Sequence, residues 1–366
     1  MTAYLSSIAS AVPPTGYSQD AILEVMRAWH GGNRRTSRVL GGIYGASAIH
    51  KRHSVVRDFL PGDSGGFFFD PESGAFLVPG TAERNRAYRR EASKLAGCAA
   101  QKALALAPGC SPQDVTHLIT VSCTGFFAPG PDIELVDALD LDPSVERFHI
   151  GFMGCYAAFP ALRLARALCE ADPEAIVMVA SVELCTLHLQ AAGDTDSLLA
   201  ASVFADGAAA AVVTARRPET PSLRLDTFAT ALARDAGDEM AWTIGDTGFE
   251  MVLSRRLPEV VEAKVGGAIA PLFRGARIRP QEVEHWAVHP GGRAILDQVE
   301  STLELGTDAL LASRAVLAEY GNMSSATVLF VLERLLAEPA PPQEPVVAIA
   351  FGPGLTVESA LFRRAC

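Results

Sequence analysis

Cys155 lies in surroundings that suit a nucleophile. The stretch GFMGCYAAFPALRLA, residues 151–165, places it after a glycine turn and before a helical pattern, with Pro160 suited to the first helical turn. A thiol at a helix N-terminus meets backbone amides and the positive end of the helix dipole, which stabilise a thiolate. Cysteine is also among the most frequently buried residue types, so this stretch alone favours a packing role.

A histidine and an asparagine far along the chain occupy comparable positions. In AVHPGGRAILD, residues 287–297, His289 ends an apolar run and precedes a Pro-Gly-Gly turn into a helix. In YGNMSSATVLF, residues 320–330, Asn322 lies in a turn at the start of another helix. Together with Cys155 they offer a nucleophile, a base and an uncharged hydrogen-bond donor.

The elements that must position these residues follow an alternating pattern, which predicts an α/β fold. Nearly continuous apolar runs predict strands covered on both faces, at 116–123, 175–183, 208–215, 285–290 and 346–352. Apolar residues at helical spacing predict core-facing helices within 91–107, 161–171 and 324–338. The stretch RRPETPS, residues 216–222, is typical of a junction between two halves.

Composition argues against several classes of partner and site. The 366 residues are 49% hydrophobic with a formal net charge of -11, which predicts a globular protein that binds neither nucleic acid nor an anionic membrane. The first residues lack a charged and apolar leader, and no apolar run reaches about 18 residues, so we expect no signal peptide, no membrane span and a cytoplasmic location. The 7 cysteines lack metal-site spacing, which predicts reduced thiols and no metal.

Longer blocks of the sequence resemble those of type III polyketide synthases, the chalcone synthase-like branch of the thiolase superfamily. The blocks run along almost the whole chain in the family's order, and they are SCTGFFAPGPD (122–132), PSVERF (143–148), GC (154–155), FADGAAAAVV (204–213), VHPGG (288–292), YGNMSSA (320–326) and FGPGLTVE (351–358). The resemblance implies a thiolase fold of five αβαβα layers, built from two similar βαβαβαββ halves, and a homodimer. The halves would be residues 1–215, with the nucleophile, and residues 216–366, with the histidine and asparagine.

The resemblance also implies the chemistry. His289, hydrogen-bonded to Cys155, would hold a thiolate that takes an acyl group from an acyl-CoA starter. Malonyl-CoA would then lose CO2, and the enolate would be stabilised by His289 and Asn322 before it attacks the acyl-cysteine. Repeated extension and ring closure would give a resorcinol-type aromatic or a pyrone. Coenzyme A thioesters are then substrates, and no cofactor or metal is implied.

Further residues match positions that line the family's substrate cavity. Phe204, before ADG, matches a gating phenylalanine between the CoA tunnel and the cavity, and Phe249 in TGFEM is expected to match the second. Cys123 and Cys185 stand where plant members carry threonines, which makes these blocks more similar to bacterial members. Ser324 matches a cavity serine. Two basic clusters could bind CoA phosphates or form a solvated face, and their candidate residues are Arg35, Arg38, Lys51 and Arg52.

Three other functions remain open on the same three residues. A single-round β-ketoacyl synthase of the same superfamily would take malonyl groups from an acyl carrier protein. A cysteine hydrolase would use Cys, His and Asn in this chain order, although the CGSCW-type context is missing. A binding protein with an inactive site is disfavoured, because all three reactive residues are present.

Overall fold

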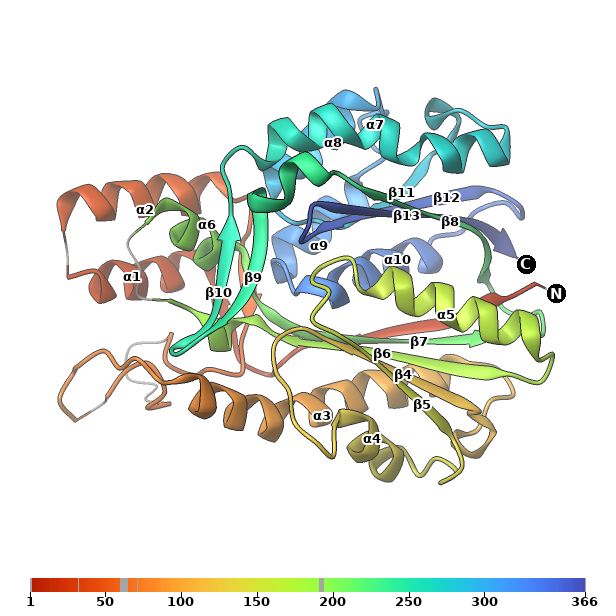
Figure 1. Ribbon diagram of the computed structural model, residues 1–366, viewed down its shortest axis with the longest axis horizontal. Helices are drawn as coiled ribbons and strands as arrows, with labels where there is room; N and C mark the ends of the chain where they lie inside the picture. The colour runs from red at the N-terminus through yellow and green to blue at the C-terminus, as the bar shows by residue number, and fades with distance from the viewer. Residues whose placement is uncertain (1, 32, 60–64, 71, 191–193, 366) are drawn as a thin grey trace.

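A mixed sheet of nine strands forms the centre of the molecule in the computed structural model, which describes residues 2–31, 33–59, 65–70, 72–190 and 194–365. In sheet order the strands are β11 (His285–Val288), β12 (Pro345–Gly352), β13 (Thr356–Ala365), β8 (Ser222–Leu232), β1 (Tyr4–Ala11), β7 (Asp206–Thr214), β6 (Ile176–Leu184), β4 (His117–Ser122) and β5 (Glu146–Gly151). β1 and β8 pair only through Tyr4 with Arg224 and Leu5 with Leu223. Beyond this short contact the strands separate into two stacked sheets (Figure 1).

Helices cover both sheets and fill the space between them, so that five layers alternate (Figure 1). The outer layer on the β4 side holds α3 (Thr81–Leu106) and α4 (Pro131–Leu139). The middle layer holds α5 (Ala158–Ala171) and α10 (Thr327–Ala337), with α9 (Leu311–Tyr320) beside α10. The outer layer on the β8 side holds α7 (Leu257–Ala276) and α8 (Arg293–Thr302). The αβαβα order expected from the sequence is therefore present.

Smaller elements gather at one end of the layers. They are α1 (Gln19–Trp29), α2 (Arg34–Ala46), α6 (Thr195–Val203), the hairpin of β9 (Met240–Gly245) and β10 (Gly248–Leu253), and the pair of β2 (Gly16–Ser18) and β3 (Lys51–His53). Short 3-10 helices are η1 (Pro112–Asp114), η2 (Cys185–His188), η3 (Arg234–Glu239), η4 (Pro280–Glu282) and η5 (Ser324–Ala326).

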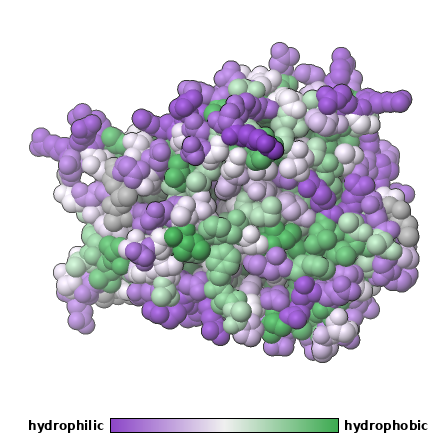
Figure 2. All heavy atoms as spheres, viewed as in Figure 1, coloured by the Kyte–Doolittle hydropathy of each residue, from purple (hydrophilic) through white to green (hydrophobic). Residues whose placement is uncertain are grey.

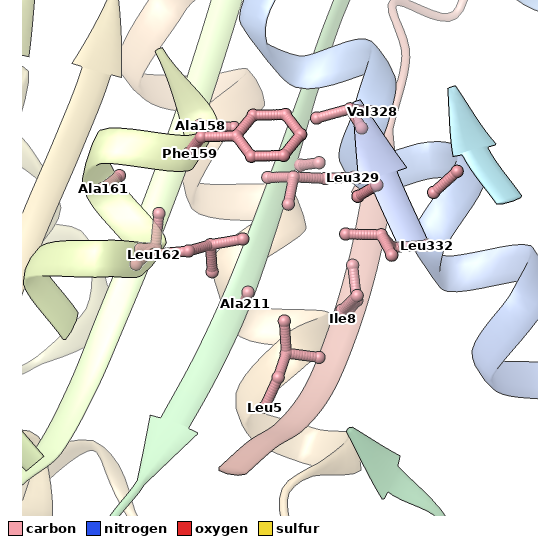
Figure 3. Packing of buried hydrophobic residues seen from close by; sticks show 14 of the residues in the cluster. Leu5, Ile8, Ala158, Phe159, Ala161, Leu162, Ala211, Val328, Leu329 and Leu332 are labelled. Atoms are coloured by element: carbon pink, nitrogen blue, oxygen red, sulfur yellow. The ribbon is translucent and has the colours of Figure 1, made fainter. Parts of the chain in front are cut away.

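The middle layer is tightly packed because small side chains on the strands let the helices approach. Phe159 of α5 and Leu329 of α10 belong to one buried cluster with Leu5 of β1 and Ala211 of β7 (Figure 3). Full burial of a leucine or phenylalanine side chain contributes about 1.5–3 kcal/mol. This cluster fixes the positions of the N-termini of α5 and α10, next to which two of the candidate catalytic residues lie.

All five predicted strands and all three predicted helices are confirmed. The apolar runs correspond to β4, β6, β7, β11 and β12, and the helical patterns to α3, α5 and α10. Every residue of β4 and β7 is buried, as expected for strands between two helical layers. The predicted apolar runs do not include β1, β5, β8 and β13, which complete the sheet.

Candidate active site

The turn that carries Cys155 is shaped by positive backbone angles. Cys155 lies between β5 and α5, three residues before the helix begins at Ala158. Phe152 and Gly154 have φ angles of 57° and 80°. A Cβ at Gly154 would lie 2.5 Å from Cδ of Pro353, so a larger residue there would disturb the turn. The predicted position of Cys155 before a helix N-terminus is confirmed.

His289 and Asn322 are held by backbone contacts from neighbouring segments. The His289 N–H donates to the Ile349 carbonyl at 2.8 Å, which extends the pairing of β11 with β12 by one residue. The Asn322 Oδ1 accepts the Ser324 N–H at 2.9 Å. Its Nδ2 is therefore the donor end, and it donates to the Gly291 carbonyl at 3.4 Å. The network thus sets which way the amide faces.

One cavity brings the three residues together. An outer cavity of about 530 Å³ is lined by Cys155, His289 and Asn322, although they are separated by up to 167 positions, from 155 to 322. Most of its other walls are apolar, including Val39 of α2 and Leu257 of α7. The arrangement is a mostly apolar pocket with one thiol, one imidazole and one amide, which suits nucleophilic attack on a carbonyl compound.

Burial keeps the thiol and the imidazole neutral. It raises the pKa of Cys155 to about 11, against the effect of hydrogen bonds from Ser324 and Asn322, and it lowers the pKa of His289 to about 3. Neither ring nitrogen of His289 has a hydrogen-bond partner among the described residues. The expected Cys155–His289 hydrogen bond and standing thiolate pair are therefore not formed in this state. The free nitrogens remain available to accept a proton or to bind a substrate oxygen.

A buried carboxylate lies beside the nucleophile, and sequence reasoning missed it. Glu183 accepts hydrogen bonds from the Cys123 N–H at 3.0 Å and the Thr124 hydroxyl at 2.8 Å, and from the Ser325 hydroxyl. Burial raises the pKa of Glu183 despite these bonds. Cys123 Sγ lies 3.4 Å from Ser324 Oγ, which places both predicted cavity residues in this cluster. The only signal in the sequence was one acid within the apolar run of β6.

A second cavity, the inner cavity, adjoins the first and shares two wall residues with it. This inner cavity of about 380 Å³ is lined by Cys185, His188 and Trp242, and Phe204 and Met251 line both cavities. Phe204 thus lies where the predicted gate should be. Trp242 is fixed by a 2.8 Å hydrogen bond from its Nε1 to the backbone carbonyl of Cys123.

Phe249 is not at the expected gate position. Its ring stacks on His188 with a centroid distance of 4.0 Å and meets the Trp242 ring at 5.7 Å, so it packs behind the cavity wall. Met251, two residues later on the same face of β10, stands opposite Phe204 between the two cavities. The interpretation of Phe249 as the second gating residue is corrected to Met251.

The predicted cations separate into exposed and buried groups. Arg35 and Arg38 are exposed on α2, one turn before the cavity residues Val39 and Gly42, and Lys51 is exposed on β3. Arg52 is 4% exposed, and its guanidinium donates to two backbone carbonyls of the α6 end. These bonds and its burial set Arg52 apart from the exposed cations, although its Nη2 has no hydrogen-bond partner among the described residues and Arg52 lines the inner cavity. Its binding of CoA phosphates stays a prediction.

Two arginines at the cavity rim were not predicted. Arg255, just before α7, and Arg293, the first residue of α8, are exposed and line the outer cavity. Arg293 also contacts Asp297 at 3.3 Å, whereas Arg255 has no ion-pair partner within the part of the chain that the structure describes. The sequence feature that could have indicated them is an arginine at the start of a helix, in SRR (254–256) and GGR (291–293).

The remaining expectations concern membranes and metals. No helix among the described residues is both long and apolar enough to cross a membrane. Within the described ranges, one group of side chains could hold a metal ion, Glu284, His285 and Glu344, and it lies apart from the residues that line the two cavities.

Comparisons with known proteins cover the whole chain. The model of the family "Chalcone and stilbene synthases, N-terminal domain" matches residues 3–217, and that of the C-terminal domain matches residues 227–365. A structure of PKS-I from the brown alga Ectocarpus siliculosus is 31% identical with a TM-score of 0.91, covering 100% of this chain and 98% of that one. The C-terminal type III polyketide synthase domain of Steely1 from Dictyostelium is 27% identical with a TM-score of 0.91, and coverage is 100% of both chains. A fungal type III polyketide synthase, ORAS, is 25% identical with a TM-score of 0.86, again with 100% coverage of both. The predicted thiolase fold is confirmed by these matches.

Proposed function

Because the chain belongs to the chalcone and stilbene synthase family of type III polyketide synthases, we propose that it loads an acyl-CoA starter on Cys155 and extends it with malonyl-CoA. The enzyme is an acyltransferase that makes polyketides. The assignment of these residues rests on the outer cavity, because Cys155, His289 and Asn322 all line it and most of its other lining residues are apolar.

In the loading step the Cys155 thiol attacks the carbonyl carbon of the starter thioester. Since the thiol is neutral in the free site, His289 accepts its proton as the sulfur–carbon bond forms. The carbon–sulfur bond to CoA breaks, and the CoA thiolate leaves with the proton returned by His289. The two unpartnered ring nitrogens support this role, because a general base needs a free lone pair inside the pocket.

In the extension step malonyl-CoA loses CO2, and the electron pair of the broken carbon–carbon bond forms a thioester enolate. The Asn322 amide Nδ2 and a His289 ring N–H donate hydrogen bonds to the enolate oxygen. The enolate carbon attacks the acyl-cysteine carbonyl, and the Cys155 sulfur leaves with the lengthened chain now on CoA. The fixed amide supports this role, because its oxygen is held by the Ser324 N–H, and its nitrogen faces the cavity side near Cys155 with only a long 3.4 Å bond to the Gly291 carbonyl to exchange for the enolate oxygen. The apolar walls favour decarboxylation of a carboxylate removed from water.

The two cavities divide the substrate between them. The outer cavity would hold the pantetheine arm, and the inner cavity would receive the growing chain past Phe204 and Met251. Ring closure there gives a resorcinol-type aromatic or a pyrone. The CoA phosphates would lie at the rim, where Arg255 and Arg293 can pair with them. Arg35, Arg38 and Lys51 are exposed and would be further candidates for binding CoA phosphates. No cofactor or metal takes part in any of these steps.

The chain would work as a homodimer of two-halved subunits. β5 is an edge strand, which pairs only with β4 in the described sheet, and edge strands invite pairing with a second chain. Figure 2 shows an apolar band across the hairpin of β9 and β10 and across α5, and the nearby Ile244 and Phe126 are 53% and 38% exposed. The halves would be residues 1–215 and 216–366. A monomeric mass in solution would contradict the dimer.

The cellular location follows from the chemistry. The acyl-CoA and malonyl-CoA substrates and the free thiols of Cys123, Cys155 and Cys185 suit a reducing compartment, which supports the cytoplasm. Measuring the protein in separated cell fractions tests this assignment.

The test of the proposed function is incubation with malonyl-CoA and a panel of acyl-CoA starters, with products identified by mass spectrometry. We expect polyketides without any acyl carrier protein, and products that require a carrier protein would favour a single-round β-ketoacyl synthase. Cys155→Ala should abolish extension but retain malonyl-CoA decarboxylation, whereas Asn322→Ala should strongly reduce both. Equal decarboxylation by the wild type and Asn322→Ala would contradict the enolate-stabilising role.

A further inference from the structure

The end of α6 is joined directly to the catalytic asparagine. α6 covers Thr195–Val203, and its C-cap is Phe204, the residue between the two cavities. The Asn322 N–H donates to the Val203 carbonyl at 2.8 Å, and the Asn322 carbonyl accepts the Ala205 N–H at 2.8 Å. This pair of bonds makes a parallel bridge between Phe204 and Asn322. Any shift of the α6 end therefore moves the backbone of Asn322.

A buried arginine and glutamine hold the same helix end from the opposite side. Nη1 of Arg52 donates to the Phe204 carbonyl at 2.7 Å and to the Ala201 carbonyl at 2.8 Å. Its Nε donates to Oε1 of Gln19 at 2.9 Å, and Nε2 of Gln19 donates to the Ser202 carbonyl at 2.8 Å. The last carbonyls of a helix lack partners within the helix. Here this pair supplies donors to the Ala201, Ser202 and Phe204 carbonyls, and the Asn322 N–H supplies the donor to Val203.

The charge of Arg52 suits this position. Arg52 is almost fully buried, and within the described residues it has no carboxylate at ion-pair distance. Carbonyl oxygens at the negative end of the α6 dipole surround the guanidinium instead. The Tyr44 ring lies 5.7 Å from Cζ of Arg52 and adds a cation–π contact. Its Nη1 and Nε are thus engaged by the α6 end and by Gln19, while its Nη2 has no partner among the described residues.

We infer that Arg52 and Gln19 are positioning residues, which fix the α6 end and thereby set the side-chain amide of Asn322 and the ring of Phe204 against Cys155. The inference rests on the proposed function, since it assigns the fixed amide to stabilisation of the enolate. Misplacement of a catalytic group by about 1 Å can reduce a rate about a hundredfold. The malonyl-CoA decarboxylation step should therefore be more sensitive to these residues than the loading step, which depends on Cys155 and His289.

The test compares Arg52→Met, which keeps a long apolar stem, with Arg52→Lys and Tyr44→Phe. Tyr44→Phe is the matched control, because it removes the other donor to the Ala201 carbonyl, at 3.2 Å, but leaves Arg52 in place. We measure kcat and KM for malonyl-CoA decarboxylation, and the acylated fraction of Cys155 by mass spectrometry after incubation with starter. In Arg52→Met we expect kcat to fall about ten- to a hundredfold, with KM and loading nearly unchanged. Arg52→Lys should recover part of kcat, and Tyr44→Phe should match the wild type.

Two results would overturn the inference. One is a kcat in Arg52→Met equal to that in Tyr44→Phe, and the other is a parallel loss of loading and decarboxylation. If Arg52→Met does not fold, Gln19→Leu replaces it, because it removes the bond to the Ser202 carbonyl and the acceptor for Arg52. An unchanged kcat in Gln19→Leu would then refute the positioning role. A wild-type enzyme without malonyl-CoA decarboxylation would instead refute the proposed function.

Discussion

Replacement of Gly154 by alanine should damage the nucleophile turn for two separable reasons. The φ angle of 80° at this position lies in the left-handed region, which costs an alanine about 1–2 kcal/mol. The new Cβ would lie 2.5 Å from Cδ of Pro353, and overpacking of this kind costs about 1–3 kcal/mol more. We therefore expect Gly154→Ala to lower the free energy of unfolding by about 2–5 kcal/mol. It should also slow acyl loading, because Cys155 is the next residue.

Gly109 provides the matched control for the backbone contribution. Its φ angle is 70°, and a Cβ there would meet nothing within 4 Å, so Gly109→Ala should cost only the conformational part. Urea unfolding gives the free energy for both variants, and Pro353→Ala completes a double-mutant cycle with Gly154→Ala. We expect Pro353→Ala to recover about 1–3 kcal/mol in the Gly154→Ala background. Equal destabilisation by the two glycine replacements would refute the contact argument, as would a cycle without coupling.

Two further predictions concern the thiol and the inner cavity. Because burial raises the pKa of Cys155 to about 11, the thiolate fraction increases with pH, and iodoacetamide should alkylate Cys155 about tenfold faster per pH unit between pH 7 and 9. Mass spectrometry of the Cys155 peptide measures this rate, and a flat profile across neutral pH would show a standing ion pair with His289 instead. Trp242→Ala removes a wall of the inner cavity and should shift products towards longer polyketides, whereas Trp242→Phe keeps most of the wall. Products of unchanged length in Trp242→Ala, measured by mass spectrometry, would argue that the chain grows elsewhere.

The alternation of strands and helices was predictable because its signals are local, whereas the five layers were expected from the family resemblance. The apolar runs of β4 and β7 follow from burial on both faces, and the helical spacing in α5 follows from one buried face. β13, in contrast, carries Arg363 and Arg364 within its run, and their contacts with β8 and the residues before β12 come from distant segments. The local sequence alone cannot show that a stretch with two arginines forms a buried strand of a sheet.

The candidate site was predictable where a short motif fixes both residue and local geometry. Cys155, His289 and Asn322 each lie at the end of a strand or in a turn whose glycines are visible in the sequence. Phe249 and Met251 share one face of β10, and only the position of the strand decides which of them meets a cavity. Sequence spacing shows that two residues share a face of a strand, but it does not show which of them lies at the cavity.

Arg52 and Glu183 show a different reason for the limits of sequence analysis. A charged residue in a sequence predicts a solvated side chain, because an unpaired buried charge is strongly disfavoured. Carbonyls about 150 positions away accept both bonds of Nη1 of buried Arg52, and donors from positions 122–124 and 325 satisfy Glu183. These partners come together only when α6 and η5 pack in the folded protein, so the sequence near Arg52 or Glu183 does not reveal them.

His289 departs from this pattern, because its partners are missing even in the assembled layers. Each unsatisfied buried nitrogen costs about 1–3 kcal/mol, so both ring nitrogens together make the site less stable than an apolar replacement would. Elsewhere the described core satisfies large polar groups such as Gln19 and Asp206. A few other buried polar atoms of the described residues also lack a partner, but only those of His289 line the outer cavity beside the thiol, where a substrate can supply the missing partner. The local conflict with stability at His289 is thus itself an argument for its catalytic role.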